Sequence, residues 1–202
     1  GGAAGLVAYL ARSGTDLVVD ATHPFAAEIS GNAQQAAAAS GTKLIAICRP
    51  GWQPVKGDRW RRHADVQSAI SAIGEKRQNV FVTLGRQELA PLLKAPQHRY
   101  VVRSVDPVEP PLALPEVEYV LARGPFDVDA ETALMSHHAI NAVITKNSGG
   151  AASYAKLEAA RRLGIKVEMI DRPEIAGDAV QTVDAALSML DHWLVSEANL
   201  DV

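Results

Sequence analysis

Short β-branched runs alternate with helical stretches along almost the whole chain, and this alternation constrains the fold more than any other feature. The run at 17–21 precedes a helical stretch at 24–40, and the run at 80–84 precedes another at 86–94. Strands and helices that take turns require crossover connections, which make neighbouring strands parallel. The sequence therefore predicts an α/β fold with mostly parallel sheets. The other expected strands are 43–48, 100–103, 119–122, 142–145 and 166–170, and the other expected helices are 6–11, 64–76, 128–138, 151–163 and 179–194.

A proline-rich segment interrupts the alternation at 105–115. Its four prolines, between Asp106 and Pro115, exclude a helix interior and a central strand. We interpret the segment as a linker between an N-terminal domain, 1–104, and a C-terminal domain, 116–202. The alternation beyond the linker repeats the alternation before it, and 202 residues suffice for two small domains.

Charge and composition exclude several classes of protein. A net charge of −3 provides no overall basic field to attract duplex nucleic acid or an acidic membrane. The 48% hydrophobic and 21% charged residues are typical of a globular chain. Cys48 is the only cysteine and no Cys/His group has zinc-ligand spacing, so we expect no internal disulfide and no structural metal. We also expect a cytoplasmic protein, because the sequence has no membrane-length apolar run and no signal-peptide pattern.

The loop Thr-Lys-Asn-Ser-Gly-Gly at 145–150 lies between an expected strand and an expected helix. Ligands of parallel sheets bind beyond the carboxyl ends of the strands, where helix N-termini present N–H groups. Gly149 and Gly150 let the backbone approach a ligand, Ser148 can cap the helix or bind an anion, and Lys146 adds a positive charge. The loop predicts a phosphate or carboxylate site, with a serine-capped glycine turn as the alternative. Lys156, further along the helix, is expected either to be solvated or to reach back towards the loop.

The corresponding loop of the first half is Asp-Ala-Thr-His-Pro-Phe at 20–25. Asp20 ends an apolar strand and needs a polar partner, while Pro24 suits the first turn of a helix. His23 follows the carboxyl end of a strand, which makes it a candidate proton donor or hydrogen-bond donor to a ligand. The alternative for Thr22 and His23 is a helix-capping role.

Several arginines also follow expected strands. In a chain of negative net charge, repeated cations at one edge of the sheets indicate an acidic ligand, because a guanidinium group binds carboxylates and phosphates in a fork. For any single arginine, a surface ion pair is the alternative. The set comprises Arg49, Arg86, Arg103, Arg123 and Arg172, while Arg59, Trp60, Arg61 and Arg62 lie in a polar connection expected to be a substrate-facing flap or plain surface.

Five groups of residues occur in an order and at spacings that resemble the precorrin-6A reductase family of cobalamin biosynthesis, from residue 1 to about residue 173. Several independent motifs in sequence are far more specific than any one of them. They are 20–26 with Ile29, Ser30, Asn32 and Ala33; Arg49 and Pro50 with Trp52; 124–126 with Glu131, Leu134 and Met135; 145–150 with Lys156, Leu157, Ala159, Ala160 and Arg161; and Ile170 with Arg172 and Pro173.

The resemblance implies two Rossmann-like three-layer halves around a central cleft. It also implies NADPH-dependent reduction of one macrocycle double bond, which converts precorrin-6A to precorrin-6B. The substrate is a tetrapyrrole with many carboxylates, which gives the arginine set a reason. Family members carry a strand, a Gly-Gly-Thr turn, an acidic helix and a second strand before the glycine cluster at 1–5, so we expect that this unit is missing here. The missing turn competes with the loop at 145–150 for the dinucleotide.

The motifs and the resemblance together predict the site residues. Hydride transfer from the nicotinamide needs a proton for the neighbouring atom, so Thr22 and His23 are predicted to face the ring as catalytic residues. The predicted cofactor-binding residues are Lys146, Asn147, Ser148, Gly149, Gly150 and Arg172, with Arg172 towards the 2′-phosphate, and the predicted substrate-binding residues are Arg49, Arg86, Arg123 and Lys156.

Two alternatives stay open. The first is the cobalt-containing substrate of the anaerobic pathway, reduced by the same fold. The second is a non-catalytic α/β module that binds an acidic small ligand. A generic short-chain reductase is disfavoured, because Tyr154 and Lys156 do not have the Tyr-x-x-x-Lys spacing.

Overall fold

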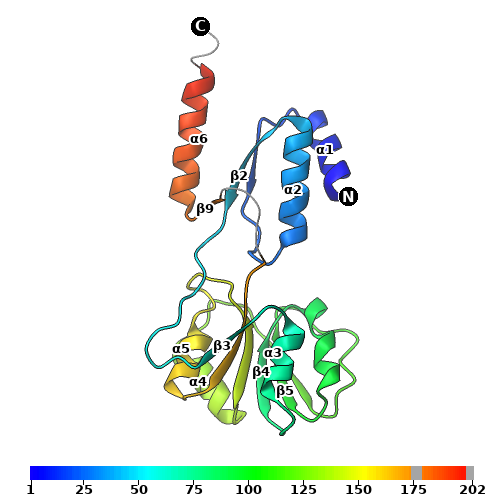
Figure 1. Cartoon of the computed structure of the whole chain (residues 1–202), viewed down its shortest axis with the longest axis vertical. Helices are drawn as coiled ribbons and strands as arrows, with labels where there is room; N and C mark the ends of the chain where they lie inside the picture. The colour runs from blue at the N-terminus through cyan, green and yellow to red at the C-terminus, as the bar shows by residue number, and fades with distance from the viewer. Residues whose placement is uncertain (174–178, 199–202) are drawn as a thin grey trace. The chain divides into compact units, whose positions relative to one another are not determined.

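The structure, a computed structural model, describes residues 1–173 and 179–198 and divides the chain into two compact units. One unit contains Gly1–Pro50 and Pro173–Val202, and the other contains Gly51–Arg172. We refer to them as the three-stranded unit and the six-stranded unit after their sheets. The chain therefore passes from the first unit to the second and back again (Figure 1).

The six-stranded unit is built on one parallel sheet with the order β3-β8-β7-β4-β5-β6. From β4 the chain steps outwards to β5 and β6, then returns to β7 on the other side of β4 and steps to β8. Right-handed crossovers in opposite directions place their connections on opposite faces of the sheet. The carboxyl ends of β4 and β7 therefore form a topological switch point, where doubly wound sheets bind ligands. The strands are β3 (Trp60–His63), β4 (Asn79–Thr83), β5 (Arg99–Ser104), β6 (Val117–Leu121), β7 (Ala142–Lys146) and β8 (Lys166–Ile170).

Helices cover this sheet. Helix α3 (Val66–Ile73) contacts the 3₁₀ segment η2 (Ala90–Lys94), whereas α4 (Val128–His137) contacts α5 (Ala155–Arg162). Local sequence sets two helix starts: the Asp65 carboxylate accepts from the backbone N–H of Ser68, and the Asp127 carboxylate accepts from those of Asp129 and Ala130. Because both faces are covered, the middle residues of the central strands are apolar, and Phe81 and Val143 are fully buried.

Edge strand β3 is polar, and a buried carboxylate of β8 holds it. Glu168 has a side chain only 1% exposed, and it accepts hydrogen bonds from Nε of Arg61 at 3.0 and 3.1 Å and pairs with Nε2 of His63 at 2.7 Å. Arg61 also donates to the carbonyl oxygen of Ala72, which lies in the last turn of α3. A buried carboxylate is costly without such partners. The pairing of Glu168 with Arg61 and His63 therefore holds β3 against β8.

The three-stranded unit has a parallel sheet with the order β1-β2-β9, made of β1 (Leu17–Asp20), β2 (Lys43–Ile47) and β9 (Ala179–Val180). Helix α1 (Gly2–Ser13) packs on α2 (Ala27–Ser40), and α2 contacts β1 and β2. Small residues of α2, such as Ala36, are buried at this close packing. Helix α6 (Val183–Ala198) contacts β2 and β9, and Figure 1 shows it on the side away from α1 and α2.

The α/β class with parallel sheets is confirmed, but the domain boundary differs from the expected one. Segment 105–115 is not a linker between units: it connects β5 to β6, which pair within one sheet from Tyr100 and Val117 onwards. The backbone N–H of Leu112 donates to the Tyr119 hydroxyl at 2.8 Å, which ties the segment to that sheet. Prolines exclude a helix, but they do not distinguish an interdomain linker from an irregular connection.

Four expected elements also differ. The polar connection around Trp60 contains β3. The ion pair between Arg61 and Glu168 stabilises this edge strand although its residues do not alternate between apolar and polar. Residues 86–94 form two 3₁₀ segments rather than an α-helix, and Pro91 lies in the first turn of the second segment. Helix α5 begins at Ala155 instead of 151, and the helix expected from 179 is preceded by β9.

We predict that Arg61→Ala lowers the free energy of unfolding by roughly 2–3 kcal/mol, because it removes a partner of a buried carboxylate. The matched control is Arg62→Ala on the same strand. Arg62 pairs with Asp171 at 2.7 Å, but both side chains are partly exposed, so we expect a loss below about 1 kcal/mol. Urea unfolding of both variants measures the difference, and equal losses would contradict the assigned role of Glu168.

Candidate functional site

The loops after β4 and β7 meet at the switch point of the six-stranded sheet. The Thr83 hydroxyl, at the end of β4, donates to the Thr145 hydroxyl of β7 at 2.9 Å. One strand position later, Lys146 forms an ion pair with Glu88 of η1 (Arg86–Glu88). The sequence pointed to Lys146 as the cation of this loop, and the structure adds Glu88 as its acidic partner.

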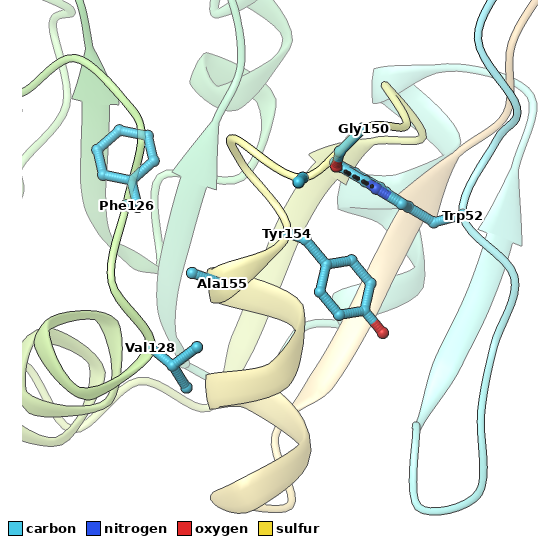
Figure 2. Close-up of a pocket in the computed structure, with 7 residues that line it drawn as sticks. Trp52, Phe126, Val128, Gly150, Tyr154 and Ala155 are labelled. Carbon is cyan, nitrogen blue, oxygen red and sulfur yellow. Dashed lines mark hydrogen bonds between the residues drawn. The ribbon is translucent and has the colours of Figure 1, made fainter. Parts of the chain in front are cut away.

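Asn147 fixes the start of the loop through the backbone of Trp52. Its Oδ1 accepts from the Trp52 N–H at 2.7 Å, and its Nδ2 donates to the Trp52 carbonyl at 3.1 Å. The indole N–H of Trp52 then donates to the carbonyl oxygen of Gly150 at 2.8 Å (Figure 2). A Cβ at Gly51 would lie 3.2 Å from Nδ2 of Asn147, so glycine permits this close approach. The Asn147 side chain is thus buried and occupied by the protein, which makes it a positioning residue.

The backbone of the loop is compatible with a phosphate ligand. Gly149 and Gly150 have φ values of 68° and 78°, a region that glycine adopts freely, and neither brings a side chain between the backbone and a ligand. Nε of Arg172 donates to the carbonyl oxygen of Asn147 at 2.7 Å, which places the guanidinium group beside the loop. The structure therefore brings Lys146, the two glycines and Arg172 to one loop, and their role in binding the cofactor stays a prediction.

Lys156 is not solvated, contrary to one of the two expectations. The residue is 4% exposed, and its ammonium group donates to the carbonyl oxygen of Ser153 at 2.7 Å. Nζ lies 5.0 Å from the centre of the Trp52 ring. Burial and, to a lesser extent, the positive charge of Arg103 lower the pKa of Lys156 to about 7, although the Glu131 carboxylate opposes this shift. The local pattern gave no signal of burial, because the lysine lies under a loop rather than on an apolar stripe.

An ion pair lies in the interior near Lys156. The Arg103 guanidinium of β5 bonds Glu131 of α4, and both side chains are at most 5% exposed. The guanidinium carbon of Arg103 is 3.6 Å from the centre of the Phe126 ring. From the sequence, Arg103 belonged only to the wider arginine set and Glu131 only to a motif, and no local pattern indicated that they pair.

A pocket opens beside this loop, with a volume of about 390 Å³. Figure 2 shows Phe126 on one side and Trp52 and Tyr154 on the other, with Val128 and Ala155 between them. Sequence reasoning did not predict the pocket, because its walls come from three segments far apart in the chain. The lining residues are Trp52, Phe126, Val128, Gly150, Ala151, Tyr154 and Ala155.

The loop at 20–25 belongs to the three-stranded unit. Burial raises the pKa of Asp20, but hydrogen bonds from Ser30 and Thr22 outweigh it and hold this pKa below its usual value. The Thr22 hydroxyl lies 3.0 Å from that of Ser30, and Nδ1 of His23 accepts from the Phe25 N–H at 3.3 Å. Within this unit, Thr22 and His23 line a hollow of about 10 Å³, roughly the room for one water. Their catalytic role stays a prediction.

The remaining predicted substrate-binding arginines are exposed. Arg86 follows β4 and Arg123 follows β6, so both lie at the carboxyl edge of the six-stranded sheet. Arg49 follows β2 in the three-stranded unit. These positions are compatible with binding carboxylates, and the roles stay predictions.

The part of the chain that the structure describes contains neither a candidate metal cluster nor a membrane-spanning helix. In 1–173 and 179–198, no three His, Cys, Asp or Glu side chains gather in a way that could hold a metal ion. Over the same ranges, no helix combines the length and the apolar character needed to cross a membrane.

The chain is similar to known proteins in both sequence and structure. Residues 1–191 match the family model described as precorrin-6x reductase CbiJ/CobK. A precorrin-6A reductase from Sinorhizobium sp. is 50% identical over 195 residues, which cover 96% of this chain and 75% of that protein. A precorrin-6A reductase from Rhodobacter capsulatus is 46% identical over 194 residues, which cover 95% of this chain and 77% of that protein. The solved structure of CobK precorrin-6A reductase superposes with a TM-score of 0.91 at 44% identity, covering 95% of this chain and 77% of that one.

The fold and the switch-point loop define a doubly wound α/β protein with a candidate ligand site at the carboxyl edge of a parallel sheet. Within that class, the chain belongs to the precorrin-6x reductase family. The family resemblance predicted from the five motifs is thereby confirmed.

We predict that the burial of Lys156 makes stability depend on pH. Because the pKa falls from 10.5 to about 7 on folding, the unfolded chain binds more protons between these values. The free energy of unfolding of the wild type should therefore rise with pH across this window, relative to Lys156→Met, by a few kcal/mol. Below pH 7 both states are protonated, so the difference between the two proteins should be constant.

Chemical unfolding at a series of pH values measures this effect. The control is Lys166→Met, which removes an exposed lysine of β8 in place of a buried one. A Lys156→Met difference that is independent of pH would show that Lys156 keeps an ordinary pKa.

Proposed function

We propose that this chain is a precorrin-6A reductase of cobalamin biosynthesis, which reduces one macrocycle double bond of precorrin-6A to give precorrin-6B with NADPH. The observation that carries the proposal is the likeness to proteins named precorrin-6A reductase over nearly the whole chain. The switch-point loop supports the nicotinamide cofactor, because dinucleotides bind where doubly wound sheets reverse their strand order. A cytoplasmic location, expected because the sequence has no membrane-length apolar run and no signal-peptide pattern, stays a prediction.

The cofactor-binding residues in this proposal belong to the six-stranded unit. Gly149 and Gly150 would receive a phosphate against the backbone, and Ser148 would add a hydroxyl. Arg172, held beside the loop by Asn147, is suited to the 2′-phosphate that distinguishes NADPH from NADH. When bound, NADPH supplies the hydride.

The chain's own residues orient the ligands and neutralise their charge. Asn147 and Trp52 hold the loop in one conformation before a ligand arrives, which lowers the entropy cost of binding. Arg86 and Arg123 would bind macrocycle carboxylates at the same sheet edge, with Arg49 as a further candidate. Thr22 and His23 are the proposed proton and hydrogen-bond donors to the ring. We do not assign Lys156 a direct contact with substrate carboxylates, because its ammonium group is buried against Ser153.

Two other functions remain to be separated by experiment. A non-catalytic module would bind the tetrapyrrole without oxidising NADPH. A cobalt-precorrin-6A reductase would prefer the substrate that carries cobalt within the macrocycle. The two curated relatives reported above are named for the metal-free substrate, which favours precorrin-6A.

The direct test is anaerobic oxidation of NADPH, followed at 340 nm, with precorrin-6A and separately with its cobalt complex. The proposal expects NADPH to be consumed with precorrin-6A and the product to gain the mass of two hydrogens. Binding of the tetrapyrrole without loss of NADPH would identify a binding module instead. Turnover of the cobalt complex alone would overturn the choice of substrate.

We further predict opposite effects for the two members of the loop's ion pair. Lys146→Ala should weaken NADPH binding by about tenfold, because it removes a cation near the phosphates. Glu88→Gln should strengthen binding severalfold, because it removes a carboxylate that competes with the phosphate for Lys146. Titration of NADPH by fluorescence measures both, and effects of the same sign would contradict this placement of the cofactor.

A further inference from the structure

The pocket beside the switch-point loop has aromatic walls that the cofactor assignment does not use. Trp52 and Tyr154 lie edge to face, with ring centres 6.0 Å apart and an angle of 61° between the ring planes. Phe126 forms the opposite wall, and Val128 and Ala155 lie between the two sides (Figure 2). The pocket volume of about 390 Å³ lies within the common range for small-molecule sites. Aromatic walls with little polar surface favour contact with a planar, conjugated ring, either face to face or edge to face.

The walls are held in place before any ligand binds. The backbone N–H of Phe126 donates to the carbonyl oxygen of Ala152 at 3.2 Å, which joins the β6–α4 loop to the segment before α5. A Cβ at Gly124 would lie 3.1 Å from that oxygen and 3.2 Å from the Phe126 ring. Glycine at 124 therefore permits the close approach of these two segments. On the other side, Asn147 fixes Trp52 through two hydrogen bonds.

Positive charges lie behind both walls. Arg103 stacks on Phe126 at 3.6 Å from the ring centre, and Lys156 lies 5.0 Å from the centre of Trp52. The only carboxylate facing Lys156 among the described charged groups that shift its pKa is Glu131, which is already bonded to Arg103. With Lys156 protonated, this group of three side chains carries a net positive charge. A ligand carboxylate near the pocket would raise the pKa of Lys156, so anion binding and protonation would support each other.

We propose that this pocket binds one ring edge of a planar, conjugated, carboxylate-bearing macrocycle. Its aromatic walls would contact the ring, and the charges behind them would favour the attached carboxylates. The inference rests on the proposed function, because that function supplies a ligand of this class. It deepens that function by giving Trp52, Phe126 and Tyr154 a direct role as the substrate subsite.

The charge behind the walls argues against the nicotinamide ring as the occupant. A nicotinamide ring that gave up its hydride here would carry a positive charge, which Arg103 and protonated Lys156 would repel. The macrocycle gains negative charge in the same step and is stabilised by nearby cations until it is protonated. The electrostatics of the pocket therefore fit the ring that accepts the hydride better than the ring that gives it.

The test fills the pocket without removing any of the aromatic walls. Val128 is the first residue of α4 and points into the pocket, so Val128→Trp should occupy the space of the ring. The matched control is Val183→Trp at the first residue of α6, where valine is 62% exposed in the other unit. Both variants are titrated with precorrin-6A alone, followed by its visible absorbance, and with NADPH alone, followed by fluorescence.

We expect Val128→Trp to raise the Kd for precorrin-6A by at least about tenfold and to leave the Kd for NADPH within about twofold of the wild type. Val183→Trp should change neither value. If Val128→Trp matches the control for both ligands, or weakens only NADPH binding, the inference is wrong. Failure of the proposed function has a different signature: the wild type would bind precorrin-6A without oxidising NADPH.

Phe126→Ala supplies a second, independent measurement, with circular dichroism as the check on folding. It removes one wall and should also weaken precorrin-6A binding, while adding no bulk that could displace the loop. An unchanged Kd for precorrin-6A in the folded variant would overturn the assignment of Phe126.

Discussion

The side-chain amide of Asn147 is the interaction on which the candidate site depends. It pairs with both the N–H and the carbonyl group of Trp52, while the backbone carbonyl oxygen of the same residue accepts from Nε of Arg172. Through Trp52 it also fixes Gly150. Removing the amide would leave buried polar groups of Trp52 without partners, which costs more than the bonds themselves contribute. The loop at 145–150, the Trp52 wall of the pocket and Arg172, the candidate for binding the 2′-phosphate, are thus all held by Asn147.

The six-stranded sheet explains why these parts meet. Parallel strands bring their carboxyl ends to one edge, and the reversal of strand order between β4 and β7 separates the connections that follow them. Strand β3, at the edge of the sheet, is the first strand that the chain forms after it leaves the three-stranded unit. Glu168 of β8 holds β3 in register. The segment after β8 then returns to the three-stranded unit. One buried carboxylate therefore holds the edge strand that the chain forms after it enters the six-stranded unit.

Local sequence was sufficient for the strand–helix alternation and for the loop around Gly149, because both depend on short-range patterns. It was insufficient for β3, whose Arg61 and His63 read as a polar connection until the buried Glu168 is known. The same limit applies to Lys156, since only tertiary packing reveals that its ammonium group is enclosed. The prolines at 105–115 likewise described a backbone that cannot be helical, but not which sheet it serves. Contacts between residues distant in sequence were what the pattern could not supply.

The most direct test of this account is the Kd for NADPH of Asn147→Ala, compared with Asn141→Ala at the opposite end of β7. Asn141 accepts from the Asn79 N–H far from the loop, so it controls for the loss of an asparagine from the same strand region. The account predicts that Asn147→Ala stays folded by circular dichroism and binds NADPH at least about tenfold more weakly, whereas Asn141→Ala binds as the wild type does. An unchanged affinity in folded Asn147→Ala would contradict the claim that this loop, held by Asn147, binds the cofactor.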